Sequence, residues 1–119
     1  MSKRIGEPIL VTGATGFVGH HLVHWLRKSE IPVRALVRQP SSPAAQKLAA
    51  TGVELAIGQI GDPASLARAA QGVGAIIHLV AIIRQRGKAT YAEVNYRGTL
   101  NVIEAAQSAR VRRLLHMSA

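Results

Sequence analysis

The stretch ILVTGATGFVGHHLVHWL (residues 9–26) contains three glycines spaced three residues apart, Gly13, Gly16 and Gly19. The apolar residues before the glycines predict a short β-strand, and the apolar spacing after them predicts a helix. Gly13 suits a tight turn, because glycine adopts backbone angles that other residues avoid. Gly16 lets an anion approach the helix N-terminus, where free N–H groups favour negative charge, and Gly19 lets the helix lie close to the strands. The stretch therefore predicts a phosphate-binding turn.

Segments typical of strands and of helices alternate along the rest of the chain. The expected strands are residues 8–12, 33–38, 53–58, 75–81 and 112–118. The expected helices are residues 17–29, 41–51, 62–72 and 91–110. Helix-length connections require a parallel sheet with helices on both faces. We therefore expect one Rossmann-like, doubly wound α/β domain over residues 1–119, with five strands in the order 3-2-1-4-5.

The first expected helix has a stripe of apolar residues, Val18, Leu22 and Trp25, that predicts its buried face. His20 and His24 lie away from this stripe, and we expect them to be solvent-exposed. A metal site is not expected, because no acidic ligand lies nearby and the HExxH pattern is absent.

Composition excludes several classes of protein. The chain has no cysteine, which excludes a disulfide scaffold or a cysteine-built zinc site. The start MSKRIGEP has no apolar signal segment, and the apolar run 73–83 is shorter than the span of about 20 residues that a membrane requires. We expect a cytoplasmic protein without membrane insertion. The net charge of +9 is scattered, and few aromatic residues could stack on bases, which favours a solvated surface or a small anion over nucleic acid.

Four motifs resemble, in order, those of the extended and atypical short-chain dehydrogenases, the NAD-dependent epimerase/dehydratase family. TGATGFVG (12–19) is similar to its TGxxGxxG fingerprint, and HLVA (78–81) to the strand end beside the nicotinamide ribose. YAEVNYRGTLNVIEAA (91–106) resembles its fourth helix, and LLHMSA (114–119) resembles the fifth strand end that carries the active-site Ser or Thr. The chain is also similar to the atypical branch that includes the NADPH-binding accessory subunit of respiratory complex I.

The resemblance implies a dinucleotide site, with NADP as the expected cofactor and NAD as the alternative. The implied cofactor-binding residues are Gly13, Thr15, Gly16, Phe17, Val18, Gly19, Arg38, Gln59, Ile60, Leu79, Val80, Ala81 and Asn95. Ser118 matches the active-site Ser by position, although a polar strand end is the simpler interpretation. His78 and His116 end two strands near the cofactor, either as ordinary strand-end histidines or as substrate contacts.

The choice of NADP depends on the end of the second strand. NAD-preferring relatives have a carboxylate there, whereas this chain has Val37 followed by Arg38. A guanidinium can bind the 2′-phosphate of NADP with two hydrogen bonds. Arg34 lies on the same face and either assists Arg38 or is solvated. Gln59 replaces an aspartate near the adenine, and either contacts the adenine or is simply exposed.

Two functions stay open. The chain resembles the N-terminal cofactor-binding part of an oxidoreductase or epimerase/dehydratase, with nucleotide sugars as one substrate class. The catalytic Tyr-x-x-x-Lys is missing, because Tyr91 and Tyr96 are followed four residues later by Asn95 and Leu100, so we expect residues 1–119 alone to be inactive. The alternative is a non-catalytic NADPH-binding module that senses redox state or supports a complex.

The fifth strand predicts a homodimer. The family sheet continues beside this strand, so its edge and the side chains of Leu114, Leu115 and Met117 should be exposed or half exposed. An unpaired strand edge is a template for pairing with another chain. We therefore expect a dimer or aggregate that forms through this strand or through the helix 91–110.

Overall fold

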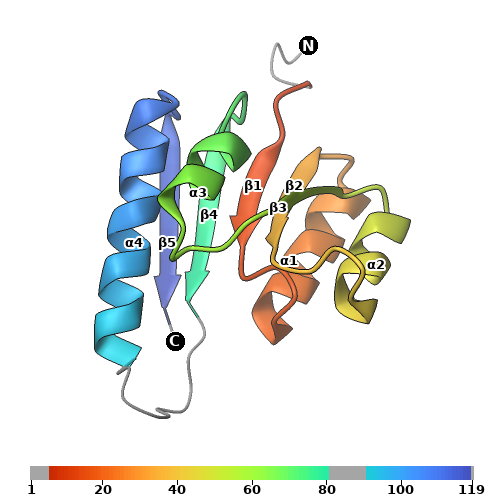
Figure 1. The fold of residues 1–119 in the computed structure, drawn as a ribbon. Helices are drawn as coiled ribbons and strands as arrows, with labels where there is room; N and C mark the ends of the chain where they lie inside the picture. Colours follow the sequence, from red (N-terminus) through yellow and green to blue (C-terminus); the bar gives the residue numbers. More distant parts are fainter. Residues whose placement is uncertain (1–5, 81–90, 119) are drawn as a thin grey trace.

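Five parallel strands form the centre of the fold in the computed structural model, which describes residues 6–80 and 91–118 (Figure 1). They are β1 (Ile9–Thr12), β2 (Val33–Val37), β3 (Glu54–Ile57), β4 (Ala75–Val80) and β5 (Arg113–Ser118). Their order is β3-β2-β1-β4-β5, so the expected topology is confirmed. The helices are α1 (Phe17–Lys28), α2 (Pro43–Ala50), α3 (Pro63–Ala69) and α4 (Tyr91–Ser108).

Local sequence signals start α2 and α3. The Ser42 side chain accepts a hydrogen bond from the backbone N–H of Ala45, and the Asp62 side chain accepts one from that of Ala64. A proline occupies the first turn of each helix, where its missing N–H costs nothing. These caps orient the two helices at the carboxyl ends of β2 and β3.

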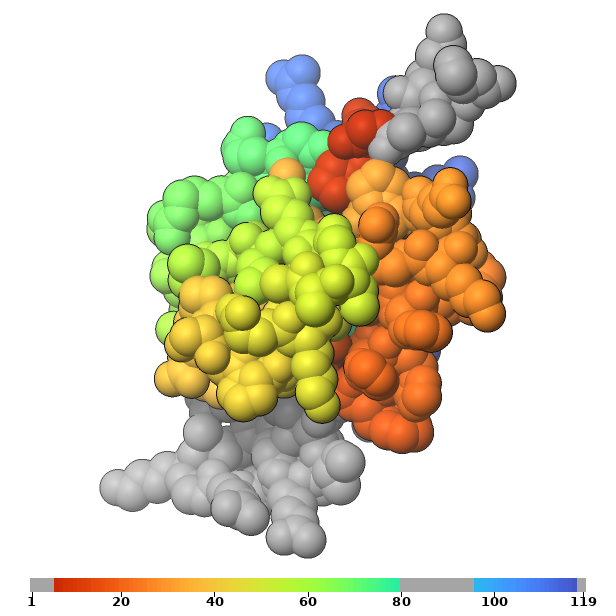
Figure 2. Space-filling model, turned by 90° about the vertical axis from the view of Figure 1, so that its right-hand side faces the viewer, coloured from red at the N-terminus to blue at the C-terminus, as the bar shows by residue number. Residues whose placement is uncertain are grey.

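The helices cover the sheet in two layers. One apolar cluster lies between the sheet and α1 with α2, and it includes Val11, Ala35 and Ile77. The other lies between the sheet and α3 with α4, and it includes Leu10 and Ile76. Neighbouring strand residues enter opposite clusters, because side chains alternate across a strand. Figure 2 looks onto the first layer, where orange α1 lies beside yellow α2.

The expected buried face of α1 is wrong. Val18 and Trp25 are 44% and 62% exposed, whereas Gly19, Val23 and Leu26 are buried and Leu22 is partly buried. The reason is the close approach of the helix to its own turn. A Cβ on residue 19 would collide with the Gly13 carbonyl oxygen and the Ala14 Cα. The glycine therefore has to face the turn, and this orientation directs residues 23 and 26 to the core.

Within residues 6–80 and 91–118, neither edge strand has a partner on its outer side. Ile57 of β3 is 62% exposed, and Leu115 and Met117 of β5 are 61% and 51% exposed. Leu114 points to the opposite face and packs, partly buried, on the cluster below α3 and α4. The expected exposure of the apolar β5 side chains is therefore confirmed.

Candidate functional site

The glycine turn connects β1 to α1 at the carboxyl edge of the sheet. Gly13 has a φ of +74°, a conformation that other residues rarely adopt. A Cβ at this position would also lie only 2.7 Å from the Leu79 carbonyl oxygen of β4. Both the backbone angle and the close approach therefore require glycine at position 13.

The N-terminus of α1 is open to an anion. Gly16 is the N-cap, with no side-chain hydrogen bond to the first turn and no acidic residue in that turn. The first N–H groups of a helix have no acceptor within the helix. Phe17 and Val18, which contribute two of these groups, have exposed side chains. The helix dipole adds a partial positive charge at the same point.

A groove of about 840 Å³ opens between the glycine turn and the carboxyl ends of β2 and β3. It is lined by Thr12, Gly13, Thr15, Leu36, Val37, Arg38, Gln39, Ser42, Gly58, Gln59, Ile60, Gly61 and Leu79. No carboxylate is among these described lining residues. Among its described lining residues the groove thus has one cation, Arg38, and no negative charge, and it adjoins the free N–H groups at the start of α1.

Six of the residues implied by the sequence line this groove together: Gly13, Thr15, Arg38, Gln59, Ile60 and Leu79. Gly16, Phe17 and Val18 form the adjoining helix N-terminus, and Gly19 lies beneath the turn against Gly13. Val80, Asn95 and Ser118 belong to β4, α4 and β5, but their side chains lie outside the described part of the chain. Ala81 lies wholly outside the described residues.

The two arginines of the second strand region have different surroundings. Arg38 is exposed in the groove, and its side chain has no hydrogen bond or ion pair with any described residue. Arg34 donates to the carbonyl oxygens of Ala69 (2.7 Å) and Gln71 (2.6 Å). Its Nε lies 3.0 Å from Glu54 Oε1 as an ion pair, without the geometry of a hydrogen bond. Neither expected role of Arg34 holds, since it neither assists Arg38 nor is solvated.

Hydrogen bonds from α3 and α4 hold the loop that follows β3. Ser65, which is buried, accepts from the Gln59 N–H at 3.1 Å and donates to the Asp62 carbonyl at 2.8 Å. Asn101 of α4 donates to the Ile60 carbonyl at 2.8 Å. Gln59 itself is exposed at the groove, so its side chain is free to meet a ligand.

Sequence reasoning missed several residues of the groove and its support. Ser42, Gly58 and Gly61 line the groove, and Gly98 leaves room for Ile60, since a Cβ there would lie 2.5 Å from the Ile60 Cδ1. The helix-capping role of Ser42 is visible in the sequence. Its position in the groove depends on the neighbouring strand.

The histidines do not form a metal site. His20, His21 and His24 are exposed on α1, which confirms the expectation for the first and third. Over residues 6–80 and 91–118, no group of three histidine or acidic side chains could hold a metal ion. His116 is exposed, whereas His78 is 1% exposed and does not line the groove.

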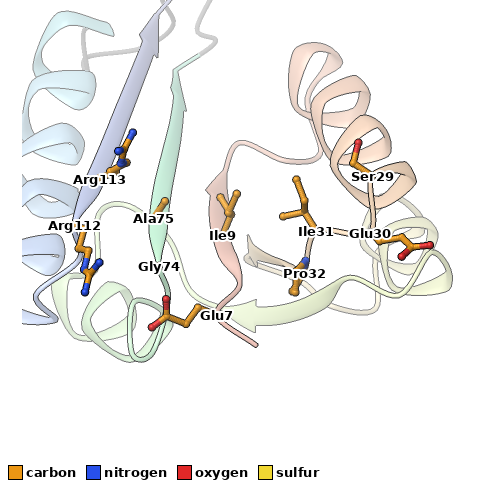
Figure 3. Close-up of a pocket in the computed structure, with 10 residues that line it drawn as sticks. All are labelled: Glu7, Ile9, Ser29, Glu30, Ile31, Pro32, Gly74, Ala75, Arg112 and Arg113. Carbon is orange, nitrogen blue, oxygen red and sulfur yellow. The ribbon is translucent and has the colours of Figure 1, made fainter. Parts of the chain in front are cut away.

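A second cavity, of about 660 Å³, lies at the opposite end of the sheet (Figure 3). Ile9, Ala75 and Ile31 contribute apolar surface, and Arg112 and Arg113 lie on one side. Ligands of doubly wound folds bind at the carboxyl ends of the strands. The cavity in Figure 3 lies near the amino ends and contains no residue of the glycine turn, so the groove is the candidate site.

Residues 9–119 match the family model described as the NAD dependent epimerase/dehydratase family. The chain belongs to this family. Ceramide reductase of Caulobacter vibrioides is 37% identical over 108 residues, which are 90% of this chain and 33% of that protein. Membership in the family supports NAD(P) binding at the glycine turn.

Two solved structures of NAD(P)-binding proteins are also similar to this chain in sequence and fold. The NADPH complex of an NADPH-dependent quinone oxidoreductase from Escherichia coli is 32% identical, with a TM-score of 0.71 over 91% of this chain and 35% of the other. A short-chain dehydrogenase/reductase superfamily protein from Agrobacterium tumefaciens with bound NAD is 34% identical, with a TM-score of 0.71 over 92% and 32%. The chain thus spans about a third of the length of the relatives that it matches.

Within the described ranges, no helix is long and apolar enough to cross a membrane.

Proposed function

We propose that residues 9–119 bind NADP(H), with the adenosine half of the cofactor in the groove and the pyrophosphate on the glycine turn. One observation carries the proposal. The groove joins an uncapped helix N-terminus to an unpaired arginine, Arg38, and no described carboxylate lines it. A ligand whose adenosine ribose has phosphates on both its 2′ and its 5′ oxygens suits this distribution of charge.

In this arrangement the backbone N–H groups of Phe17 and Val18 donate to the pyrophosphate. Gly13, Thr15 and Gly16 shape the turn around it, and the Gly16 N–H donates to the Gly13 carbonyl oxygen at 3.1 Å. Gln59 accepts from the adenine amine through its side-chain carbonyl, and Ile60 packs on the adenine. We assign Leu79, Val80, Ala81 and Asn95 to the nicotinamide ribose side. Ser118 stays a candidate catalytic residue by its position alone.

The preference for NADP over NAD follows from Arg38. The 2′-phosphate carries about two negative charges, and a carboxylate at the end of β2 would repel it. Ser42 lies in the same part of the groove at the N-terminus of α2, and its hydroxyl proton is available to a phosphate oxygen while its lone pair caps the helix. Hydrogen bonds to charged groups contribute about 1.5–3 kcal/mol.

The test is calorimetric titration of NADP⁺ and NAD⁺ into wild type and Arg38→Ala. We expect about tenfold to hundredfold weaker binding of NADP⁺ and little change for NAD⁺. The matched control is Arg112→Ala, which removes an exposed arginine at the other cavity and should change neither affinity. An equal loss for both cofactors, or tighter wild-type binding of NAD⁺, would contradict the assignment.

We further propose that the chain is the N-terminal cofactor-binding part of a longer reductase or epimerase/dehydratase. Its coverage of about a third of its relatives supports this proposal. The catalytic Tyr-x-x-x-Lys and the substrate-binding part would then belong to the remaining length, so residues 1–119 alone should be inactive. The cytoplasmic location stays a prediction.

We also propose that in residues 1–119 by themselves β5 mediates pairing with a second copy of the chain. Its outer edge has no partner strand among the described residues, and Leu115 and Met117 are exposed beside that edge. Pairing would satisfy the backbone donors and acceptors of the edge and cover these side chains.

A further inference from the structure

His78 is one of three buried polar side chains in the described part of the chain, with Thr12 and Ser65. The parallel register places Thr12 of β1, His78 of β4 and His116 of β5 in one row across the sheet. Thr12 directly precedes Gly13, and Leu79, which follows His78, has the carbonyl oxygen that Gly13 approaches. The row therefore lies directly behind the glycine turn.

The hydrogen bonds indicate which ring nitrogen of His78 carries the proton. Thr12 Oγ1 accepts from the Leu79 backbone N–H at 3.3 Å and lies 2.6 Å from His78 Nδ1. Among the described contacts, Nδ1 is the one acceptor for the proton of the buried Thr12 hydroxyl, so we assign Nδ1 as the unprotonated nitrogen. The proton of the neutral ring consequently lies on Nε2, which donates to Thr99 Oγ1 of α4 at 3.2 Å.

The surroundings of the ring favour this neutral form. Burial, and then the positive charge that His116 can carry, lower the pKa of His78 from 6.5 to about 4. Among the described residues, His116 is the titratable group that faces it, with ring centroids 5.3 Å apart in a stacked pair, while Thr12 and Thr99 do not titrate. A proton on Nδ1 would replace the acceptor by a second donor and abolish the bond from Thr12.

We propose that His78 is a positioning residue for the cofactor: as the Nε2–H tautomer it holds the Thr12 hydroxyl, and through it the glycine turn, at the separation from β4 that the pyrophosphate requires. The bond to Thr99 anchors the same ring to α4. This inference rests on the proposed function, since it concerns the same turn.

Variants can separate the two hydrogen bonds of the ring. His78→Asn places an amide oxygen where Nδ1 was and keeps an acceptor for Thr12. His78→Gln reaches toward Thr99 but removes that acceptor. Thr12→Val removes the hydroxyl at nearly constant shape, and Thr12→Ser restores it. A neutral hydrogen bond corresponds to about threefold to tenfold in affinity, so Thr12→Val and His78→Gln should weaken NADP⁺ binding by that factor, while Thr12→Ser and His78→Asn stay close to wild type.

A second ligand distinguishes positioning from general loss of structure. Adenosine 2′-monophosphate has the phosphate for Arg38 but no pyrophosphate for the turn. Thr12→Val and His78→Gln should bind it as wild type does, whereas a partly unfolded protein would bind both ligands more weakly. Failure of wild type to bind either ligand would overturn the proposed function. Normal wild-type binding with no loss of NADP⁺ affinity in Thr12→Val and His78→Gln would overturn only the positioning role.

The tautomer has a spectroscopic test that needs no ligand. The nitrogen-15 chemical shifts of the His78 ring should show an unprotonated Nδ1 and a protonated Nε2, unchanged across neutral pH. A protonated Nδ1, or a ring that titrates with the ordinary pKa of histidine, would refute the inference.

Discussion

The two ends of β2 each have an arginine, and the two guanidinium groups have opposite surroundings. Arg34 is bound to two carbonyl oxygens at the end of α3 and to Glu54. Arg38, at the carboxyl end, is exposed and unpaired among the described residues. At the amino end of β2 the guanidinium group stabilises the fold, whereas at the carboxyl end it is available to a ligand. An arginine near a strand end therefore predicts an anion site only when its guanidinium group has no partner within the fold.

The largest expected effect is at the glycine turn, at the carboxyl end of the sheet. Gly13→Val has to adopt a left-handed conformation that costs about 1–2 kcal/mol and brings a side chain against the Leu79 carbonyl. We expect cofactor binding to fall by more than about a hundredfold, with lower stability, as measured by NADP⁺ titration and urea unfolding. Gly6→Val is the control, since nothing lies within 4 Å of a Cβ there. If Gly13→Val binds NADP⁺ as tightly as wild type does, the carboxyl end of the sheet is not the cofactor-binding end.

The next effect is the acid dependence of stability that His78 confers on the ligand end. Its pKa is 6.5 unfolded and about 4 folded, so the folded state binds fewer protons in this interval. The free energy of unfolding should therefore rise as pH increases from about 4 to about 6.5, by at most about 3 kcal/mol from this residue. Urea unfolding across this range measures it. His78→Asn should have a shallower slope, and equal slopes would show that the folded-state pKa is not lowered.

A smaller effect is expected at the other end of β2. Arg34→Met keeps the apolar stem but leaves the Ala69 and Gln71 carbonyls without their donor, which should lower the free energy of unfolding by about 1–2 kcal/mol. NADP⁺ affinity should not change. Arg38→Met should show the reverse, with stability within about 0.5 kcal/mol of wild type. Equal losses of stability in Arg34→Met and Arg38→Met would contradict the different roles of the two arginines.

The smallest effect on the folded chain is expected at the β5 edge. Leu115→Lys adds a charge at an exposed position and should leave stability within about 0.5 kcal/mol of wild type, while it converts the expected dimer to a monomer in light scattering. Leu100→Lys makes the same change on α4, where residue 100 is 41% exposed. If Leu100→Lys dissociates the dimer and Leu115→Lys does not, the interface lies on α4. A monomeric wild type would contradict the dimer.

Much of the fold was predictable because its signals are local. The glycine spacing, the Pro43 and Pro63 helix starts, and the alternation of apolar runs with helical segments depend on neighbours within a few residues. Helix-length crossovers then restrict the sheet to very few topologies, which is why the strand order could be predicted. The glycine turn was predictable for the same reason, since both its backbone angles and its helix belong to one short stretch.

The sequence by itself thus determined the element order, the sheet order and the position of the phosphate-binding turn. The tertiary structure decided which face of α1 is buried, because a collision between residue 19 and Gly13 selects the rotation of the helix. It also decided that Arg34 belongs to the end of α3 and that His78 connects Thr12 to Thr99. The partners of Arg34 and His78 are separated from them by 21 to 66 residues in the chain, and no local pattern specifies which distant partner a polar side chain meets.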